Sequence, residues 1–225
     1  MDAPNHSAER NLSVLVVLEA IQLFVVAPLS AEPGVRVPAW SFFVILAANV
    51  AVVLAVVWRR PVAVAAVSLA ALTEVAAVLL RLLRPSANSA TLDLAAVLLL
   101  LVALTVVLSL TVFGPGRVTV HRIVGAIAIY LNVATVFAMA YRTIASLSQG
   151  AFGMPAGTAP GHGLSTFIYF SFVTLTTTGY GDIIPVDPLA RSLCNVEAIF
   201  GQLFPATLLA RLITLELEHR REARG

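Results

Sequence analysis

Six long apolar stretches fix the class of fold that this chain can adopt. They cover about residues 12–30, 38–58, 61–83, 92–113, 121–147 and 188–215. As a helix that rises ~1.5 Å per residue, each is long enough to cross ~30 Å of hydrocarbon. With 59% hydrophobic and only 12% charged residues, the chain has too little polar surface for a water-soluble protein. The sequence therefore predicts an all-α membrane protein with six transmembrane helices.

The segment between the last two stretches carries the most specific motif. A chain whose carbonyl oxygens all face one way needs alternating left- and right-handed backbone conformations, and Gly179 and Gly181 reach the left-handed ones without a Cβ penalty. Four such segments around one axis can replace the hydration shell of a potassium ion with rings of carbonyl oxygens. The ligands that we expect are the carbonyl oxygens of Thr177, Thr178, Gly179 and Tyr180, with the Thr177 hydroxyl.

Over about residues 120–217 the chain resembles the potassium channel pore family. The family signature Thr-Val-Gly-Tyr-Gly-Asp is matched except at Thr178, where the family usually has Val or Ile. The resemblance implies a re-entrant pore helix and a selectivity filter between the last two transmembrane helices. It also implies a homotetramer that conducts potassium passively, with no cofactor besides the transported ion. The surrounding matches are a short helix at Ser165–Thr176, then Pro185, Arg191 and Gly201.

Several positions around the filter are assigned through this resemblance. Asp182, with Arg191 nearby, is placed at the outer mouth, but Val173 stands where some members have an acid that pairs with this Asp. Ser165 is expected to cap the short helix, and Gly150–Gly163 to form an exposed loop. Tyr180 is expected to point away from the axis as a spacer. A Thr178 hydroxyl behind the filter leaves a non-selective cation channel as the alternative to potassium selectivity.

The last apolar stretch contains an acid and a possible gate. Glu197 is predicted to brace the filter through Thr174 or Thr176; the alternative is a solvated residue in a crevice. Gly201 occupies the family's hinge position, although a glycine there also allows close helix packing. Pro205 should kink the helix because it lacks an N–H. The residues predicted to face the pore are Gln202, Pro205 and Leu209.

The predicted domains are a four-helix part at 1–116, a pore part at 117–217 and a short tail at 218–225. The voltage-gated layout needs repeated arginines on the fourth helix, and residues 92–113 contain none. We therefore expect little voltage dependence. Glu19 and Glu74 are interpreted as structural polar groups that pair with Gln22, Asn49 or their surroundings, with a proton or ligand sensor as the alternative.

Charge placement predicts the orientation in the cell membrane. Nine of the 14 basic residues, all of them arginines, fall on the side that would be cytoplasmic if both termini were inside. The expected partners are three identical subunits and membrane lipid, since no basic patch suits nucleic acid. Four scattered histidines and one cysteine offer no catalytic site, so an enzyme is not expected. A membrane sensor or scaffold with a degenerate pore remains the alternative from another class.

Overall fold

The computed structural model describes residues 6–32, 35, 37–38, 40–113, 120–154 and 163–222. This part of the chain is mostly helical and contains six helical segments that are long and apolar enough to cross a membrane. The prediction of an all-α membrane protein with six such segments is confirmed. The segments are Asn11–Ser30, Trp40–Val57, Pro61–Leu83, Ala87–Val112, Arg122–Leu147 and Pro188–Arg211.

The first segment is one continuous rod with a widened turn. It consists of α1 (His6–Ile21), a π-helical turn η1 (Gln22–Val26) and α2 (Ala27–Ala31). The Ala27 N–H bonds to the Gln22 carbonyl, five residues back. Pro28 follows directly and has no N–H to donate to the residue four positions earlier, which accounts for the wider turn. The sequence analysis did not predict this turn, although Pro28 is a signal for it.

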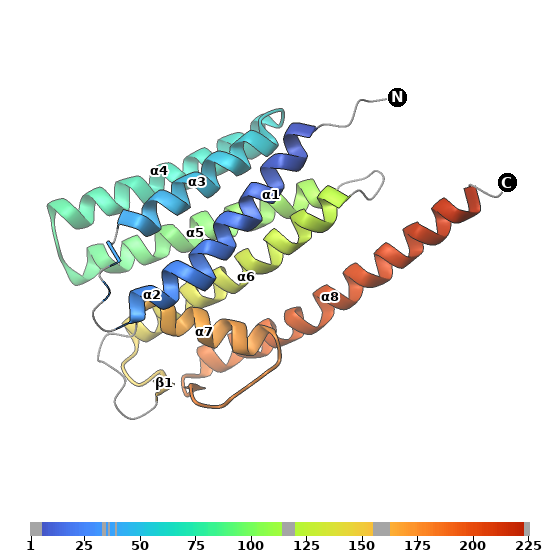
Figure 1. The fold of residues 1–225 in the computed structure, drawn as a ribbon. Helices are drawn as coiled ribbons and strands as arrows, with labels where there is room; N and C mark the ends of the chain where they lie inside the picture. The colour runs from blue at the N-terminus through green and yellow to red at the C-terminus, as the bar shows by residue number, and fades with distance from the viewer. Residues whose placement is uncertain are drawn as a thin grey trace.

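The next three segments form antiparallel helices. They are α3 (Trp40–Val57), α4 (Pro61–Leu83) and α5 (Ala87–Val112). α4 packs on α5, α5 packs on α6, and α1 lies between α3 and α6 (Figure 1). α5 begins five residues before the predicted start because Ser86 and Ser89 form a reciprocal capping box.

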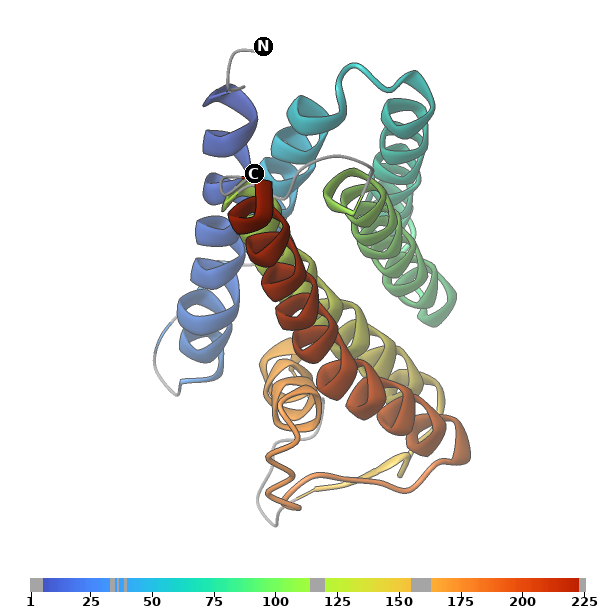
Figure 2. The same ribbon diagram turned by 90° about the vertical axis from the view of Figure 1, so that its right-hand side faces the viewer.

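The last two long helices flank a short one. α6 (Val120–Leu147) and α8 (Pro188–Glu222) enclose α7 (Leu164–Leu175) in the sequence, and α8 packs mainly on α6 and α7. In Figure 2, α8 runs diagonally in front of α6. The start of α1 and the end of α8 lie at one end of the molecule, whereas α7 lies toward the other (Figure 1).

Two short strands join the chain before α7 to the chain after it. β1 (Phe152–Gly153) pairs antiparallel with β2 (Ile184–Pro185), with Phe152 opposite Pro185. Ala151 and Phe152 are buried. The prediction of an exposed loop over Gly150–Gly163 is therefore wrong at its start, because the apolar Phe152 ring packs among the aromatic rings of α6 and α7. Residues 155–162 of that prediction lie outside the described part.

The outer faces of the helices are apolar. Val62 is 82% exposed and Leu83 79% exposed, and similar side chains cover α3, α4 and α5. Exposed apolar surface of this extent suits contact with lipid rather than water. The buried core lies between the helices, where α1, α5 and α6 meet, and its largest members include Leu15, Leu100, Leu104, Leu108 and Ile129.

Candidate ion-conduction site

The segment after α7 is held by the end of that helix. α7 starts at Leu164 with Gly163 as its N-cap, and no side chain caps it. The prediction that Ser165 caps this helix is wrong, because Ser165 already lies within the first turn. At the other end, the N–H groups of Thr178 and Gly179 both bond to the Val173 carbonyl, at 3.0 and 3.2 Å. These bonds fix where the chain leaves α7.

Residues 177–181 have an alternating backbone. The φ angles of Thr177, Gly179 and Gly181 are 58°, 59° and 77°, so every second residue is left-handed. The expectation for the two glycines is confirmed. Thr177 was not expected there, since a left-handed residue with a Cβ costs roughly 1–2 kcal/mol. Its N–H bonds to the Thr174 carbonyl at 3.0 Å, which helps to hold this conformation.

The threonines at the end of α7 bond to each other. The Thr176 hydroxyl lies 2.9 Å from that of Thr178 and 2.6 Å from the Phe172 carbonyl. The Thr178 side chain therefore turns back toward α7, where a Val could make no hydrogen bond.

Tyr180, within this segment, packs against a tyrosine of α7. The Tyr180 ring stacks on the Tyr169 ring of α7, with centroids 6.5 Å apart and an interplanar angle of 5°. The Tyr169 hydroxyl donates a hydrogen bond of 2.9 Å to Asp182 Oδ2. Asp182 thus has a partner on α7 even though Val173 cannot supply one. The sequence analysis missed Tyr169, which lies one helical turn before Val173 and carries a hydroxyl on its ring.

Arg191 does not bond to Asp182. Its Nε donates to the Pro185 carbonyl at 3.1 Å, so the side chain holds β2 in place. The start of α8 is capped by Asp187, whose Oδ1 accepts from the N–H of Leu189 at 2.8 Å. The sequence analysis did not single out Asp187, although an acid just before a proline at a helix start is a recognisable cap.

Glu197 lies at a fully buried junction of three helices. Its carboxylate accepts a hydrogen bond of 2.6 Å from the Tyr141 hydroxyl of α6 and another from the Ser171 hydroxyl of α7. The predicted partners Thr174 and Thr176 are wrong, because their hydroxyls bond to carbonyls of α7 itself. The crevice alternative is also wrong, since Glu197 is 0% exposed. The carboxylate links α6, α7 and α8, and its contact on α7 lies about one helical turn before the end of that helix.

Gly201 marks the closest approach of α8 to α7. A Cβ placed on Gly201 would lie 1.9 Å from the Leu175 carbonyl oxygen, so no larger residue fits. This contact gives the glycine a packing role. Pro205 lies inside α8 and removes the N–H that would bond to the Gly201 carbonyl. In the single chain, the predicted pore-facing residues are all exposed: Gln202, Pro205 and Leu209.

The buried acids of the first four segments pair differently from the prediction. Glu19 accepts a hydrogen bond of 3.3 Å from Asn132 of α6, and neither Gln22 nor Asn49 is its partner. The Thr105 hydroxyl of α5 adds a further hydrogen bond, which it donates to Asn132 Oδ1 at 3.0 Å. The correction follows from the packing of α1 against α6, which the separate apolar stretches do not reveal.

Comparison with known proteins identifies the family. The family described as "Ion channel" matches residues 95–217, which is more than half of the chain. The chain belongs to the ion channel family. This channel protein is a multi-pass membrane protein and not an enzyme. The matched range starts within α5 and includes α6, α7 and most of α8.

Two curated relatives each match about a third of this ion channel chain. Inward rectifier potassium channel Kirbac3.1 of Paramagnetospirillum magnetotacticum is 36% identical over 75 residues, which are 33% of this chain and 23% of that protein. Protein LctB of Geobacillus stearothermophilus is 32% identical over 80 residues, 34% of this chain and 59% of LctB. The matches therefore span less than two thirds of the length of either relative. No solved structure matches the chain.

Proposed function

We propose that the chain is one of four identical subunits of a potassium-selective channel. The observation that carries this proposal is the alternating backbone at Thr177, Gly179 and Gly181, directly between the end of α7 and Asp182. Alternation turns successive carbonyl oxygens toward one side of the segment. In this proposal, the carbonyl oxygens of residues 177–180 and the Thr177 hydroxyl bind dehydrated potassium in successive rings.

The exposure of the segment supports a tetramer. Residues 176–182 are all exposed in the single chain, including the Tyr180 side chain at 70%. One strand supplies only one side of an ion's coordination shell, so three further copies must complete it. The relative from P. magnetotacticum is named as a potassium channel, which supports potassium as the ion. Lipid would cover the apolar outer faces of α3 and α4.

The proposed pathway runs along α8. Residues 117–217 would supply the pore and residues 1–116 an accessory part, followed by a tail at 218–225. Asp182 from four subunits would concentrate cations at an extracellular mouth. Gln202, Pro205 and Leu209 would line the inner pore, with the Gly201–Pro205 region as the gate. Both termini would then be cytoplasmic, which agrees with α1 starting and α8 ending at the same end of the molecule (Figure 1).

Reversal potentials in planar bilayers test this function. With potassium on one side and sodium on the other, the proposal expects a reversal potential close to that of potassium. A reversal potential near zero would show a non-selective cation channel. If the purified protein showed no conductance, the alternative of a membrane sensor or scaffold would be favoured. Gly179→Ala should abolish conduction because it strains a left-handed residue, whereas Gly153→Ala, which has no positive φ and no contact under 3.8 Å, should not.

A further inference from the structure

A cavity of about 360 Å³ lies among the first five membrane-spanning segments, away from the proposed ion pathway. Leu164 at the start of α7 and Met139 of α6 form part of its wall, so it lies toward the end of the molecule that holds α7 (Figure 1). Apolar side chains such as Phe42 and Phe43 cover one side. Its volume lies in the range of about 300–1,000 Å³ that is typical of small-molecule sites.

Two carboxylates on the cavity wall each have an oxygen without a hydrogen-bond donor in the described part of the chain. Glu74 of α4 is 6% exposed and Asp93 of α5 is 7% exposed. Arg81 Nη1 lies 2.5 Å from Asp93 Oδ2, which satisfies only one oxygen of that acid. Within the described part of the chain, Asp93 Oδ1 and Glu74 Oε2 have no hydrogen-bond partner. Because a buried acceptor without a donor is unfavourable, these oxygens call for a ligand that donates hydrogen bonds.

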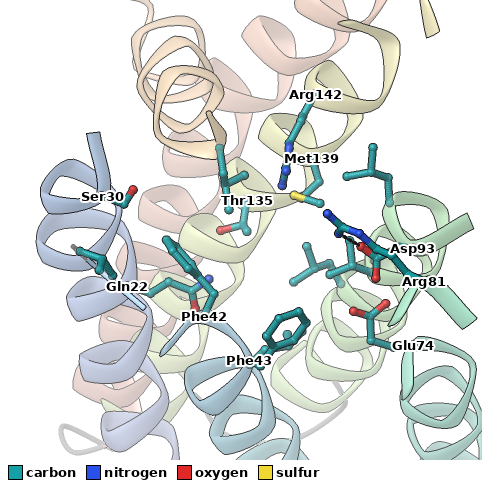
Figure 3. A pocket seen from close by; sticks show the side chains of 16 residues that line it. Gln22, Ser30, Phe42, Phe43, Glu74, Arg81, Asp93, Thr135, Met139 and Arg142 are labelled. Carbon is teal, nitrogen blue, oxygen red and sulfur yellow. Dashed lines mark hydrogen bonds and ion pairs between the residues drawn. The ribbon is translucent and has the colours of Figure 1, made fainter. Parts of the chain in front are cut away.

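A cationic group faces the same cavity from another helix. Arg142 of α6 projects into the cavity from the side away from Glu74 (Figure 3). It is half-buried and makes no hydrogen bond or ion pair with any residue that the structure describes. The wall therefore offers unpaired acceptors at Glu74 and Asp93, an unpaired donor at Arg142, and apolar surface between them.

We infer that this cavity binds a zwitterion that carries a primary ammonium and an anionic group on an apolar body. The ammonium donates to the carboxylates of Glu74 and Asp93, and the anionic group accepts from Arg142. The apolar body lies against Phe42 and Phe43. A free apolar amino acid and the headgroup of an ethanolamine phospholipid share this chemistry. The inference concerns binding alone, so it stands or falls independently of potassium conduction.

Thermal unfolding of the purified full-length chain in detergent, titrated with four probes, tests the ligand chemistry. The probes are short-chain phosphatidylethanolamine, phosphatidylcholine, phosphatidylglycerol and free L-leucine. Phosphatidylcholine has a cation without N–H donors, and phosphatidylglycerol has no cation. We expect phosphatidylethanolamine or leucine to raise the unfolding midpoint at a concentration at least tenfold below that needed for the other two. A response to the phospholipid alone identifies a lipid ligand, and a response to leucine alone identifies a soluble one. Equal effects of the three phospholipids without a leucine effect overturn the inference.

Two variants and a matched control test the residues. Glu74→Gln should weaken binding of the active probe about tenfold or more, because a charge-assisted hydrogen bond is lost. Glu19→Gln makes the same substitution at another buried acid, outside the cavity wall, and should leave the affinity unchanged. Arg142 is less buried than Glu74, so we expect the fold to tolerate Arg142→Gln more readily than Glu74→Gln. This variant should also weaken binding. Unchanged affinity in a folded Glu74→Gln or Arg142→Gln variant overturns the assignment.

Discussion

The Ser171 hydroxyl of α7 donates to the Glu197 carboxylate of α8 in a contact from which water is excluded. Tyr141 of α6 donates to the other oxygen of the same carboxylate. One acid therefore joins the three helices around the proposed filter. Replacing it leaves the buried Tyr141 hydroxyl without this acceptor, whereas the Ser171 hydroxyl keeps the Ala134 carbonyl 2.8 Å away.

We predict that Glu197 variants destabilise the channel in a fixed order. Glu197→Ala leaves the Tyr141 hydroxyl unpaired, at about 1–3 kcal/mol, whereas the Ser171 hydroxyl can still donate to the Ala134 carbonyl at 2.8 Å. Glu197→Gln keeps one acceptor oxygen and should lie between wild type and the Ala variant. Thermal unfolding of the purified channel in potassium and in sodium would measure this. An Ala variant with wild-type stability in both salts would contradict the bracing role.

Tyr169→Phe should weaken the outer end of the filter without disturbing the fold. The change removes the 2.9 Å bond to Asp182 but keeps the ring that stacks on Tyr180. Because the site is exposed, we expect a modest loss of about 0.5–1.5 kcal/mol, seen as faster loss of current during sustained opening. Asp182→Asn in the same recordings should act in the same direction. A current that decays at the wild-type rate in both variants would rule out this bond as a support.

Gly201→Ala is predicted to be far more damaging than Gly153→Ala. The new methyl group at 201 would meet the Leu175 carbonyl oxygen at 1.9 Å, whereas at 153 the nearest atom is 3.8 Å away. We expect a loss of at least about 1–3 kcal/mol at 201, or failure to assemble, because a backbone atom cannot move aside easily. Gel filtration and thermal unfolding would compare the two variants. A stable, assembled Gly201→Ala channel that differs only in gating would instead indicate a hinge.

Thr178→Val should sharpen potassium selectivity or lengthen openings. The variant cannot make the 2.9 Å bond to the Thr176 hydroxyl, and so it removes a polar contact behind the filter that competes with the backbone. Reversal potentials with potassium and sodium on opposite sides would report the change. Thr174→Val is a suitable control, since the Thr174 hydroxyl bonds only to the Phe170 carbonyl of its own helix. Lower selectivity in Thr178→Val than in wild type would contradict the prediction.

Membrane potential should open the channel only weakly. α5 contains no arginine, and Asp93 near its start is held by Arg81. Each unit charge that crosses the field contributes only ~2.3 kcal/mol per 100 mV, so a helix without a charge ladder has little to respond with. Steady-state conductance over a range of voltages measures the apparent gating charge. A steep rise that requires several charges per subunit would show a sensor elsewhere in the chain.

Local sequence signals predicted the helices and their approximate ends. Pro61 and Pro188 begin α4 and α8, and Gly179 and Gly181 take the backbone conformations expected of them. These features depend on single residues and their neighbours, so one sequence is enough to recognise them. The same reasoning missed the start of α5 only because the cap at Ser86 precedes the apolar run.

Contacts between distant segments were not predictable in the same way. Glu197 was recognised as an unusual acid, yet its partners Tyr141 and Ser171 lie on two other helices whose rotation the sequence does not define. The hydrogen bond between Asn132 and Glu19 was not predicted for the same reason. The left-handed Thr177 is a further case, because its conformation follows from how the chain leaves α7.

The pairing of β1 with β2 has a consequence for how this chain can diverge. Phe152 and Pro185 anchor the two ends of the connection that contains α7 and the filter, so the backbone is fastened on both sides of it. Closing a longer loop costs only about 0.6 kcal/mol for each doubling of its length. Extra residues inserted between Met154 and Gly163 would therefore leave the anchor points where they are. A protein engineer can therefore insert an epitope at this place without redesigning the proposed pore.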